Sequence, residues 1–218
     1  MVQILILAAV AAFLFWRLSI VLGIRTGFEK VTDIKPIDSS KKSGTNSAEP
    51  ISENSGDDDI SDYIELSSCA GKKLKDIKLV EPNFSVKNFV TGAKTAYELI
   101  LMAFEKGDLS ILEKHLAEEV YKDFKNVVTD RANNGYKVDA TFIGVREIRI
   151  KDVSFDEENL NAEIKMLFKC ELTSVVRDKD DNIVEGSPTA VKKHTDLWTF
   201  GRLMGTNDPS WKLIATGE

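Results

Sequence analysis

The sequence NAEIKMLFKCEL, residues 161–172, decides the fold of the C-terminal part of this chain. Apolar side chains occupy every second position from Ala162 to Leu172, and four of the five positions between them are charged. A period of two places these two sets on opposite faces of an extended strand. The segment is therefore predicted to be a long β-strand with one buried face, and Cys170 to be a thiol in that face.

Other strand-like segments flank this one. Residues 141–150 precede it, and residues 190–202 and 211–216 follow it, with turn residues between each pair. Short runs of this kind separated by turns are typical of antiparallel sheets. The turn at residues 178–182 begins like a calcium loop, but Ile183 stands where that loop needs glycine, so a simple hairpin turn is predicted.

Two amphipathic helices are predicted before the sheet. Apolar residues recur at steps of three and four from the candidate N-cap Ser85 to Phe104, and Gly107 ends this first helix. Asp108 can cap a second helix, which continues to the turn residues at 133–135. Helices followed by a meander predict an α+β domain over residues 85–218, with the helices covering one face of a curved antiparallel sheet.

The N-terminus predicts a membrane anchor, assigned to residues 1–27. Residues 4–24 are apolar apart from Arg17 and Ser19, and as a helix they would span about 31 Å, the thickness of a bilayer core. Residues 1–3 lack the positive charge of a cleaved signal peptide, which favours an uncleaved helix. Arg17, Arg25 and Lys30 put the nearby positive charge on the C-terminal side, which predicts that the C-terminal domain lies in the cytoplasm and the N-terminus outside.

Residues 28–70 lack sustained periodicity and are rich in polar residues, which predicts a disordered linker. Its three adjacent carboxylates, residues 57–59, lack the glycine turn and bidentate glutamate of a calcium site and are interpreted as a solvated charge run. A basic lead-in, residues 71–84, follows. Its lysines alternate with aliphatic residues and are candidate ligands for anionic lipid, the alternative being an ordinary lysine-rich approach to the domain. They are Lys72, Lys73, Lys75 and Lys78.

Composition and residue types exclude several functions. A net charge of −6 and a pI near 5.2 argue against binding along nucleic acid. Two cysteines without a CxxC pair predict no disulfide framework, and no cofactor or metal site is expected. The chain has none of the common catalytic motifs, so no enzyme is predicted. A pocket enzyme that moves a proton remains an alternative, and its candidate residues are Tyr97, Tyr121, His194 and Asp196.

Four stretches together resemble a known family. They are FLFWRLSIVLGIRTGFE (residues 13–29), FEKGDLSILEKHL (104–116), HTDLWTFGR (194–202) and PSWKLIATGE (209–218). Their order and spacing are similar to those of alphaproteobacterial members of the translocase-of-the-inner-membrane subunit forty-four (Tim forty-four-like) family. The resemblance covers the anchor and the C-terminal domain, and leaves the linker without a counterpart.

The resemblance implies a location in a bacterial inner membrane and a cone-shaped fold similar to nuclear transport factor two, with a helical wall, a strongly bent sheet and an apolar pocket. It also implies cardiolipin in the bilayer, a translocon and a DnaK-type chaperone as partners. The function predicted is a non-enzymatic adaptor in inner-membrane protein transport or biogenesis, and the alternative is a carrier of lipid or another small apolar ligand. The aromatic residues that would line the pocket, or else fill the core, are Tyr97, Phe104, Trp198, Phe200 and Trp211.

Overall fold

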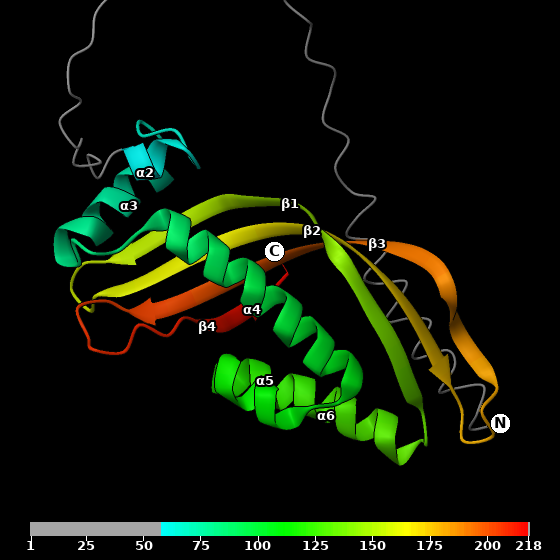
Figure 1. Ribbon diagram of the computed structural model, residues 1–218. Coiled ribbons are helices and arrows are strands. Elements are labelled where there is room, and N and C mark those ends of the chain that lie inside the picture. The colour runs from blue at the N-terminus through cyan, green and yellow to red at the C-terminus, as the bar shows by residue number, and fades with distance from the viewer. Residues whose placement is uncertain (1–57, 218) are drawn as a thin grey trace, which may run out of the picture. The chain divides into compact units, whose positions relative to one another are not determined.

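The computed structural model describes residues 58–217, in which five helices precede four strands (Figure 1). It confirms an α+β domain whose helices lie against an antiparallel sheet. No helix in these residues is both long and apolar enough to cross a membrane. The predicted anchor and most of the predicted linker lie outside the described residues and stay predictions.

Helix α4, Val86–Lys106, matches the predicted first helix. Ser85 caps it, since its hydroxyl accepts the backbone N–H three residues on at 3.2 Å. Gly107 ends it with φ 72°, a left-handed conformation that glycine adopts without steric cost. Asp108 then caps α5, Leu109–His115, as predicted. The buried face of α4 consists of Val86, Phe89, Val90, Ala93, Tyr97, Ile100 and Ala103.

The prediction of one continuous second helix is wrong. The chain forms α5 and then a separate helix α6, Glu118–Asn133, with the extended residue Leu116 between them. Leu116 is buried and makes a parallel bridge to Leu213, whose carbonyl accepts the N–H of Ala117 at 2.8 Å. This contact with the last strand interrupts the helix. The spacing of apolar residues in residues 109–128 does not predict the interruption.

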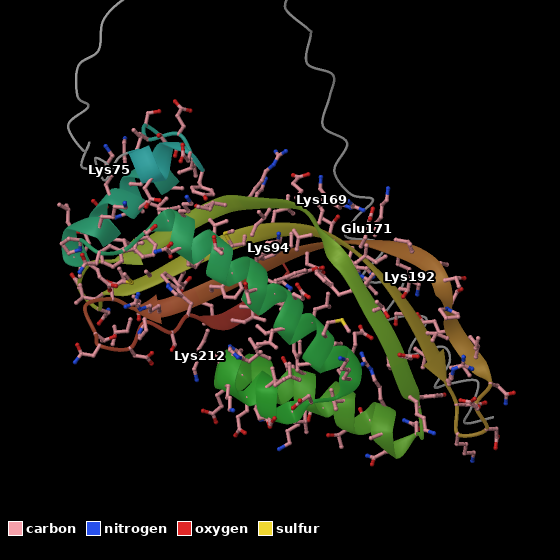
Figure 2. The ribbon with its side chains drawn as sticks, viewed as in Figure 1. Lys75, Lys94, Lys169, Glu171, Lys192 and Lys212 are labelled. Atoms are coloured by element: carbon pink, nitrogen blue, oxygen red, sulfur yellow. The ribbon has the colours of Figure 1, made fainter. Side chains whose placement is uncertain are left out.

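The sheet is the predicted meander. Its strands are β1 Lys137–Asp156, β2 Asn161–Arg177, β3 Ile183–Leu203 and β4 Lys212–Thr216. They lie in the order β1-β2-β3-β4, and every neighbouring pair is antiparallel. The predicted alternation in β2 is confirmed, because all six apolar residues of its inner face are at most 1% exposed. The charged residues between them, including Lys169 and Glu171, project from the opposite face (Figure 2).

Strands β1 to β3 extend beyond their predicted bounds. Residues 173–177 of β2 lack a clean alternation, yet they pair with residues 137–141 of β1, and residues 174–177 also pair with residues 183–187 of β3. Backbone hydrogen bonds on both sides therefore hold this segment as a strand, although the pattern of its side chains does not predict one. Gly186 permits the close pairing, because a Cβ there would overlap the carbonyl of Ser174.

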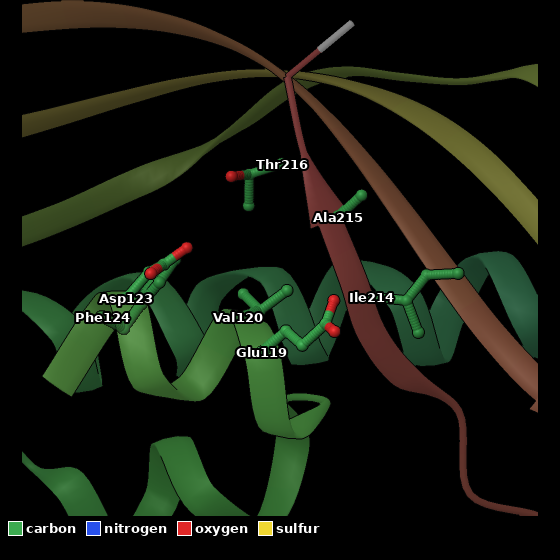
Figure 3. A pocket seen from close by; sticks show the side chains of 7 residues that line it. All are labelled: Glu119, Val120, Asp123, Phe124, Ile214, Ala215 and Thr216. Carbon is green, nitrogen blue, oxygen red and sulfur yellow. The ribbon is translucent and has the colours of Figure 1, made fainter.

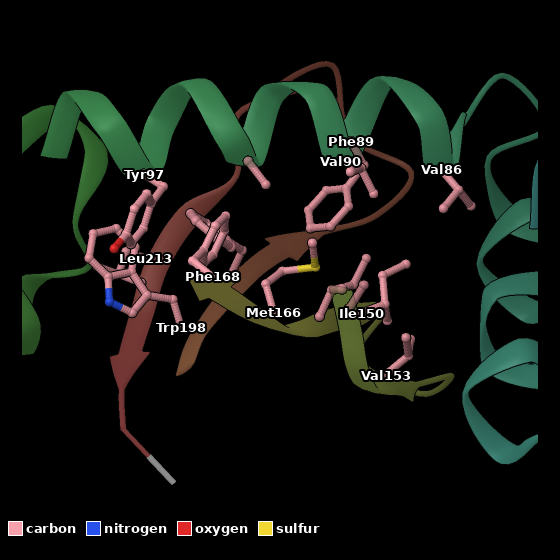
Figure 4. Close-up of a cluster of buried hydrophobic side chains, with 14 of the residues drawn as sticks. Val86, Phe89, Val90, Tyr97, Ile150, Val153, Met166, Phe168, Trp198 and Leu213 are labelled. Atoms are coloured by element: carbon pink, nitrogen blue, oxygen red, sulfur yellow. The ribbon is translucent and has the colours of Figure 1, made fainter. Parts of the chain in front are cut away.

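The core lies between α4 and the inner face of the sheet (Figure 4). Tyr97 from α4 stacks on Phe168 from β2 with ring centroids 4.3 Å apart and planes 6° apart. Trp198 and Phe200 from β3 contact Phe168 edge-on. Such aromatic clusters remove large areas from water and have preferred geometries, so they fix how the helix sits on the sheet.

The region before Ser85 is more ordered than predicted. Residues 58–61 form a short helix, α2 Asp58–Ser61, and α3 Cys69–Val80 replaces the basic lead-in. Ile60, Leu74 and Ile77 from these helices are completely buried. The linker prediction is therefore wrong at its C-terminal end, because widely spaced apolar residues in polar sequence become buried only against the sheet and α4.

Asp59 is a structural residue, and its interpretation as part of a solvated charge run is wrong. Its carboxylate accepts the backbone N–H groups of Val86 and Lys87 at 2.7 and 3.0 Å, at the start of α4. It also pairs with the Lys78 ammonium at 2.9 Å. Asp59 thus holds α2, α3 and α4 together through one charged group.

Replacing Asp59 with asparagine is expected to lower the melting temperature of the domain in a pH-dependent way. Burial alone would raise the Asp59 pKa, but the hydrogen bonds from Lys78 and from the α4 backbone outweigh it and hold the pKa below its usual value. A lowered folded-state pKa gives stability that is present above the unfolded pKa, near 4, and is lost as the pH falls through the folded pKa. The difference between parent and variant, measured by thermal melts, should be largest near neutral pH and shrink below about pH 4. A difference that does not change with pH would show that the charge of Asp59 is not what stabilises the domain.

Candidate functional site

Two of the sequence-predicted catalytic candidates meet inside the domain. The Tyr97 hydroxyl donates to Oδ2 of Asp196 at 2.7 Å, and its oxygen lies 3.0 Å from Sγ of Cys170. His194 is the cross-strand neighbour of Cys170 and is half-buried. Tyr121 belongs to a different surface, on α6, where the Lys125 ammonium lies 5.7 Å from its ring centre.

The electrostatics of this cluster favour a structural role. Burial, with the negative charge of Asp196 next in importance, raises the pKa of Tyr97 far above its usual value. Burial also raises the pKa of the Cys170 thiol. Both groups are therefore protonated at neutral pH, and Tyr97 is 0% exposed, so no substrate reaches its hydroxyl in this conformation. The cluster satisfies polar groups in the core and fixes the position of α4 over β3.

The aromatic residues proposed for a pocket divide into two groups. Tyr97, Trp198 and Phe200 are at most 5% exposed and pack on one another as core. Phe104 and Trp211 are partly buried at the edges of that core. Ring contacts thus fill the space between α4 and the sheet around Tyr97, Trp198 and Phe200.

The Phe104 ring packs against side chains of α6 and does not form the wall of a pocket. Its ring packs against Phe124 of α6 at 4.8 Å between centroids. The Arg131 guanidinium lies 4.2 Å from the centre of the same ring and donates to the Phe104 carbonyl at 3.3 Å. These contacts attach α6 to the end of α4.

An open groove lies elsewhere, between α6 and β4 (Figure 3). Its volume is about 260 Å³, and it is partly open to solvent. Helix α6 contributes two carboxylates, Glu119 and Asp123, and the apolar side chains Val120 and Phe124. Strand β4 contributes Ile214, Ala215 and Thr216. The groove therefore combines an apolar floor, an acidic rim and the border of a β-sheet.

The sequence comparison decides the family. The model of the Tim44-like domain matches residues 70–218. The chain belongs to the Tim44-like domain family. This family is associated with protein transport or biogenesis at membranes. The match includes α3 and the whole sheet, so the groove and the aromatic core both belong to the Tim44-like domain.

Comparison with solved structures gives a more distant likeness. The chain is similar to the crystal structure of the intermembrane-space region of the chloroplast protein ARC6. The identity is 14%, the match covers 59% of this chain and 94% of that chain, and the TM-score is 0.42. No curated protein matches the sequence at a significant level.

Two of the four lysines predicted to bind lipid form ion pairs within the Tim44-like domain. Lys78 is held by Asp59, and Lys73 pairs with Asp76 at 3.3 Å and with Glu157 at 3.1 Å. Lys72 is exposed, and Lys75 follows it by three residues on α3 (Figure 2).

Leu79 is 81% exposed and lies two helical turns from Lys72 on the same side of α3. Lys72, Lys75 and Leu79 therefore lie along one side of α3. Leu74 and Ile77, on the other side of the helix, belong to the core.

Sequence reasoning missed the acidic groove of the Tim44-like domain. Glu119 and Asp123 are four residues apart, a spacing that places both on one side of a helix. That spacing was the available signal, but charged residues four apart are also common on solvated helix faces. Only the position of β4 beside α6 turns the pair into the rim of a groove.

Proposed function

We propose that this chain is a non-enzymatic, membrane-anchored adaptor in protein transport or biogenesis at a bacterial inner membrane. Residues 4–24 anchor it, and the Tim44-like domain holds a partner protein on the cytoplasmic side. The family implies a translocon component or a DnaK-type chaperone as that partner. We also propose that the domain has a cone-shaped fold related to that of nuclear transport factor two.

One observation favours an adaptor over a ligand carrier. A carrier needs an internal chamber for its ligand, whereas here Tyr97, Phe168, Trp198 and Phe200 fill the region between α4 and the sheet. The groove on this domain instead opens to solvent between α6 and β4. Surface features of this kind support binding to another macromolecule.

Anionic lipid, cardiolipin included, is the second proposed partner. Lys72 and Lys75 on the outer side of α3 supply positive charge, and Leu79 supplies an apolar side chain that can enter the headgroup region. The anchor would keep this surface near the bilayer, because α3 is close in sequence to the end of the linker.

Site-resolved photo-crosslinking of the full chain in cells tests both partners. A photoreactive phenylalanine analogue replaces Leu79 on α3 in one strain, and Lys94, Ile183 or Thr216 in others, all of which are exposed. We expect phospholipid adducts at Leu79, because it would lie at the membrane surface, and a defined protein adduct at one or more of the other positions. Mass spectrometry identifies each adduct, and samples kept in the dark are the control. Cells that yield no protein adduct from any position would contradict the adaptor function.

A further inference from the structure

The outer edge of strand β4 is paired with another segment of the chain at one residue. Among residues 58–217, β4 has β3 as its only strand neighbour. On the other edge, Leu116 makes a single parallel bridge to Leu213, and Leu213 accepts one hydrogen bond from Ala117. The chain then turns away as α6, starting at Glu118. Leu116 therefore occupies the place where a fifth strand would pair with Leu213. Beside the next residues of β4 lies the groove.

The groove lies where that fifth strand would continue. Its β4 wall is formed by Ile214, Ala215 and Thr216, which directly follow Leu213. Ala215 and Thr216 are exposed, whereas Leu213 is completely buried. A strand edge beside a helix, with room between them for side chains, is the arrangement by which an extended peptide joins a sheet.

The side chains of the groove select the chemistry of the occupant. Val120 and Phe124 of α6 give it an apolar floor. Glu119 and Asp123 are exposed on the rim, and neither has an ion-pair partner among the described residues. Two carboxylates repel an anionic headgroup and attract lysine or arginine.

We propose that an extended, lysine- or arginine-bearing segment of a partner protein adds to the outer edge of β4 as a fifth strand. Its backbone continues the ladder that Leu116 begins, and its apolar side chains enter the groove. A basic side chain from the same segment reaches the carboxylates of Glu119 and Asp123. This inference rests on the proposed adaptor function and assigns the partner a place on the domain.

The probe is a fluorescein-labelled peptide, TVKVTIKVT, which alternates β-branched and basic residues. The full chain is held in nanodiscs of zwitterionic phosphatidylcholine, so that the bilayer does not attract the lysines. We expect saturable binding by fluorescence polarisation and slower hydrogen exchange at residues 214–216 of β4. A peptide with glutamate in place of lysine should not bind, and a peptide with N-methylated backbone amides should not bind, because it cannot pair with a strand edge.

A pair of charge-matched variants tests the site. Glu119→Gln with Asp123→Asn should weaken binding of the lysine peptide about tenfold at low salt, because it removes both rim charges. Glu98→Gln with Glu113→Gln removes the same charge from α4 and α5, away from the groove, and should leave affinity within about twofold. Both variants are polar surface changes, so thermal melts should match those of the parent.

Several results would overturn the inference. Equal affinity for both double variants, or for the N-methylated peptide, would show that the peptide binds elsewhere or without strand pairing. Protection of residues 214–216 without peptide would assign the edge to the chain's own N-terminal segment if it required residues 28–57, or to a second copy if it required high protein concentration. Should the peptide fail to bind while in-cell protein adducts persist, the adaptor function would stand and this docking site would not.

Discussion

Phe168→Ala should lower the free energy of unfolding of the Tim44-like domain by about 3–5 kcal/mol, the largest effect expected here. Phe168 is 0% exposed and stacks on Tyr97, with Trp198 and Phe200 at its edges. Alanine would leave a cavity between three large rings, whose positions are fixed by α4 and β3 and which cannot collapse into the space. A loss of this size is comparable with the whole stability of a marginal domain.

The measurement is denaturant unfolding of residues 58–218, followed by far-ultraviolet circular dichroism. Leu79→Ala is the matched control, since it removes a large apolar side chain that is 81% exposed and should change stability by less than about 0.5 kcal/mol. If Phe168→Ala unfolds at the same denaturant concentration as the control, the aromatic cluster does not hold α4 on the sheet.

The second large effect is expected from Glu81→Ala, at about 2–4 kcal/mol. Glu81 caps the end of α3, and both of its carboxylate oxygens accept from the Arg202 guanidinium of β3 at 3.0 Å. The Arg202 side chain is only 7% exposed. Without Glu81 the Arg202 guanidinium stays largely out of water and loses its directly hydrogen-bonded carboxylate, keeping only the bond to the Asp208 carbonyl at 3.0 Å. Such a loss costs more than that of an exposed pair.

Two comparisons separate this buried pair from ordinary surface charge. Lys73→Ala removes the exposed pair with Glu157 and should have a far smaller effect on the denaturation midpoint. Glu81→Ala combined with Arg202→Met removes the unpaired charge and should recover part of the loss. If the double variant is as unstable as Glu81→Ala, the unpaired charge is not the source of the instability.

The elements with one strong local signal were predictable from sequence. Helix α4 has an apolar period, a capping serine and a terminal glycine that all agree, and its bounds match the structure. The inner face of β2 from Ala162 to Leu172 is equally clear, because a single period of two separates apolar from charged residues. Turn residues at 178–182 likewise fixed the hairpin between β2 and β3.

Elements that depend on distant contacts were not predictable in the same way. The break between α5 and α6 exists because Leu116 pairs with Leu213, almost a hundred residues later in the chain. Asp59 reads locally as one of three solvated carboxylates and becomes a cap only when the start of α4 lies beside it. Among the candidate site residues, the meeting of Tyr97 with Asp196 was named as an alternative from sequence. The complete burial of Tyr97 was visible only in the structure.

The sequence alone determined an α+β domain, its first long helix, the order of its strands and its resemblance to the Tim forty-four-like family. These features follow from periodicity and turn chemistry within short segments, and from residues matched in order. Tertiary structure alone decided which lysines of α3 are paired, that aromatic rings fill the interior, and that β4 lies beside the carboxylates of α6. Such features depend on contacts between residues far apart in the chain. The local pattern of a single sequence does not predict which distant groups will come into contact.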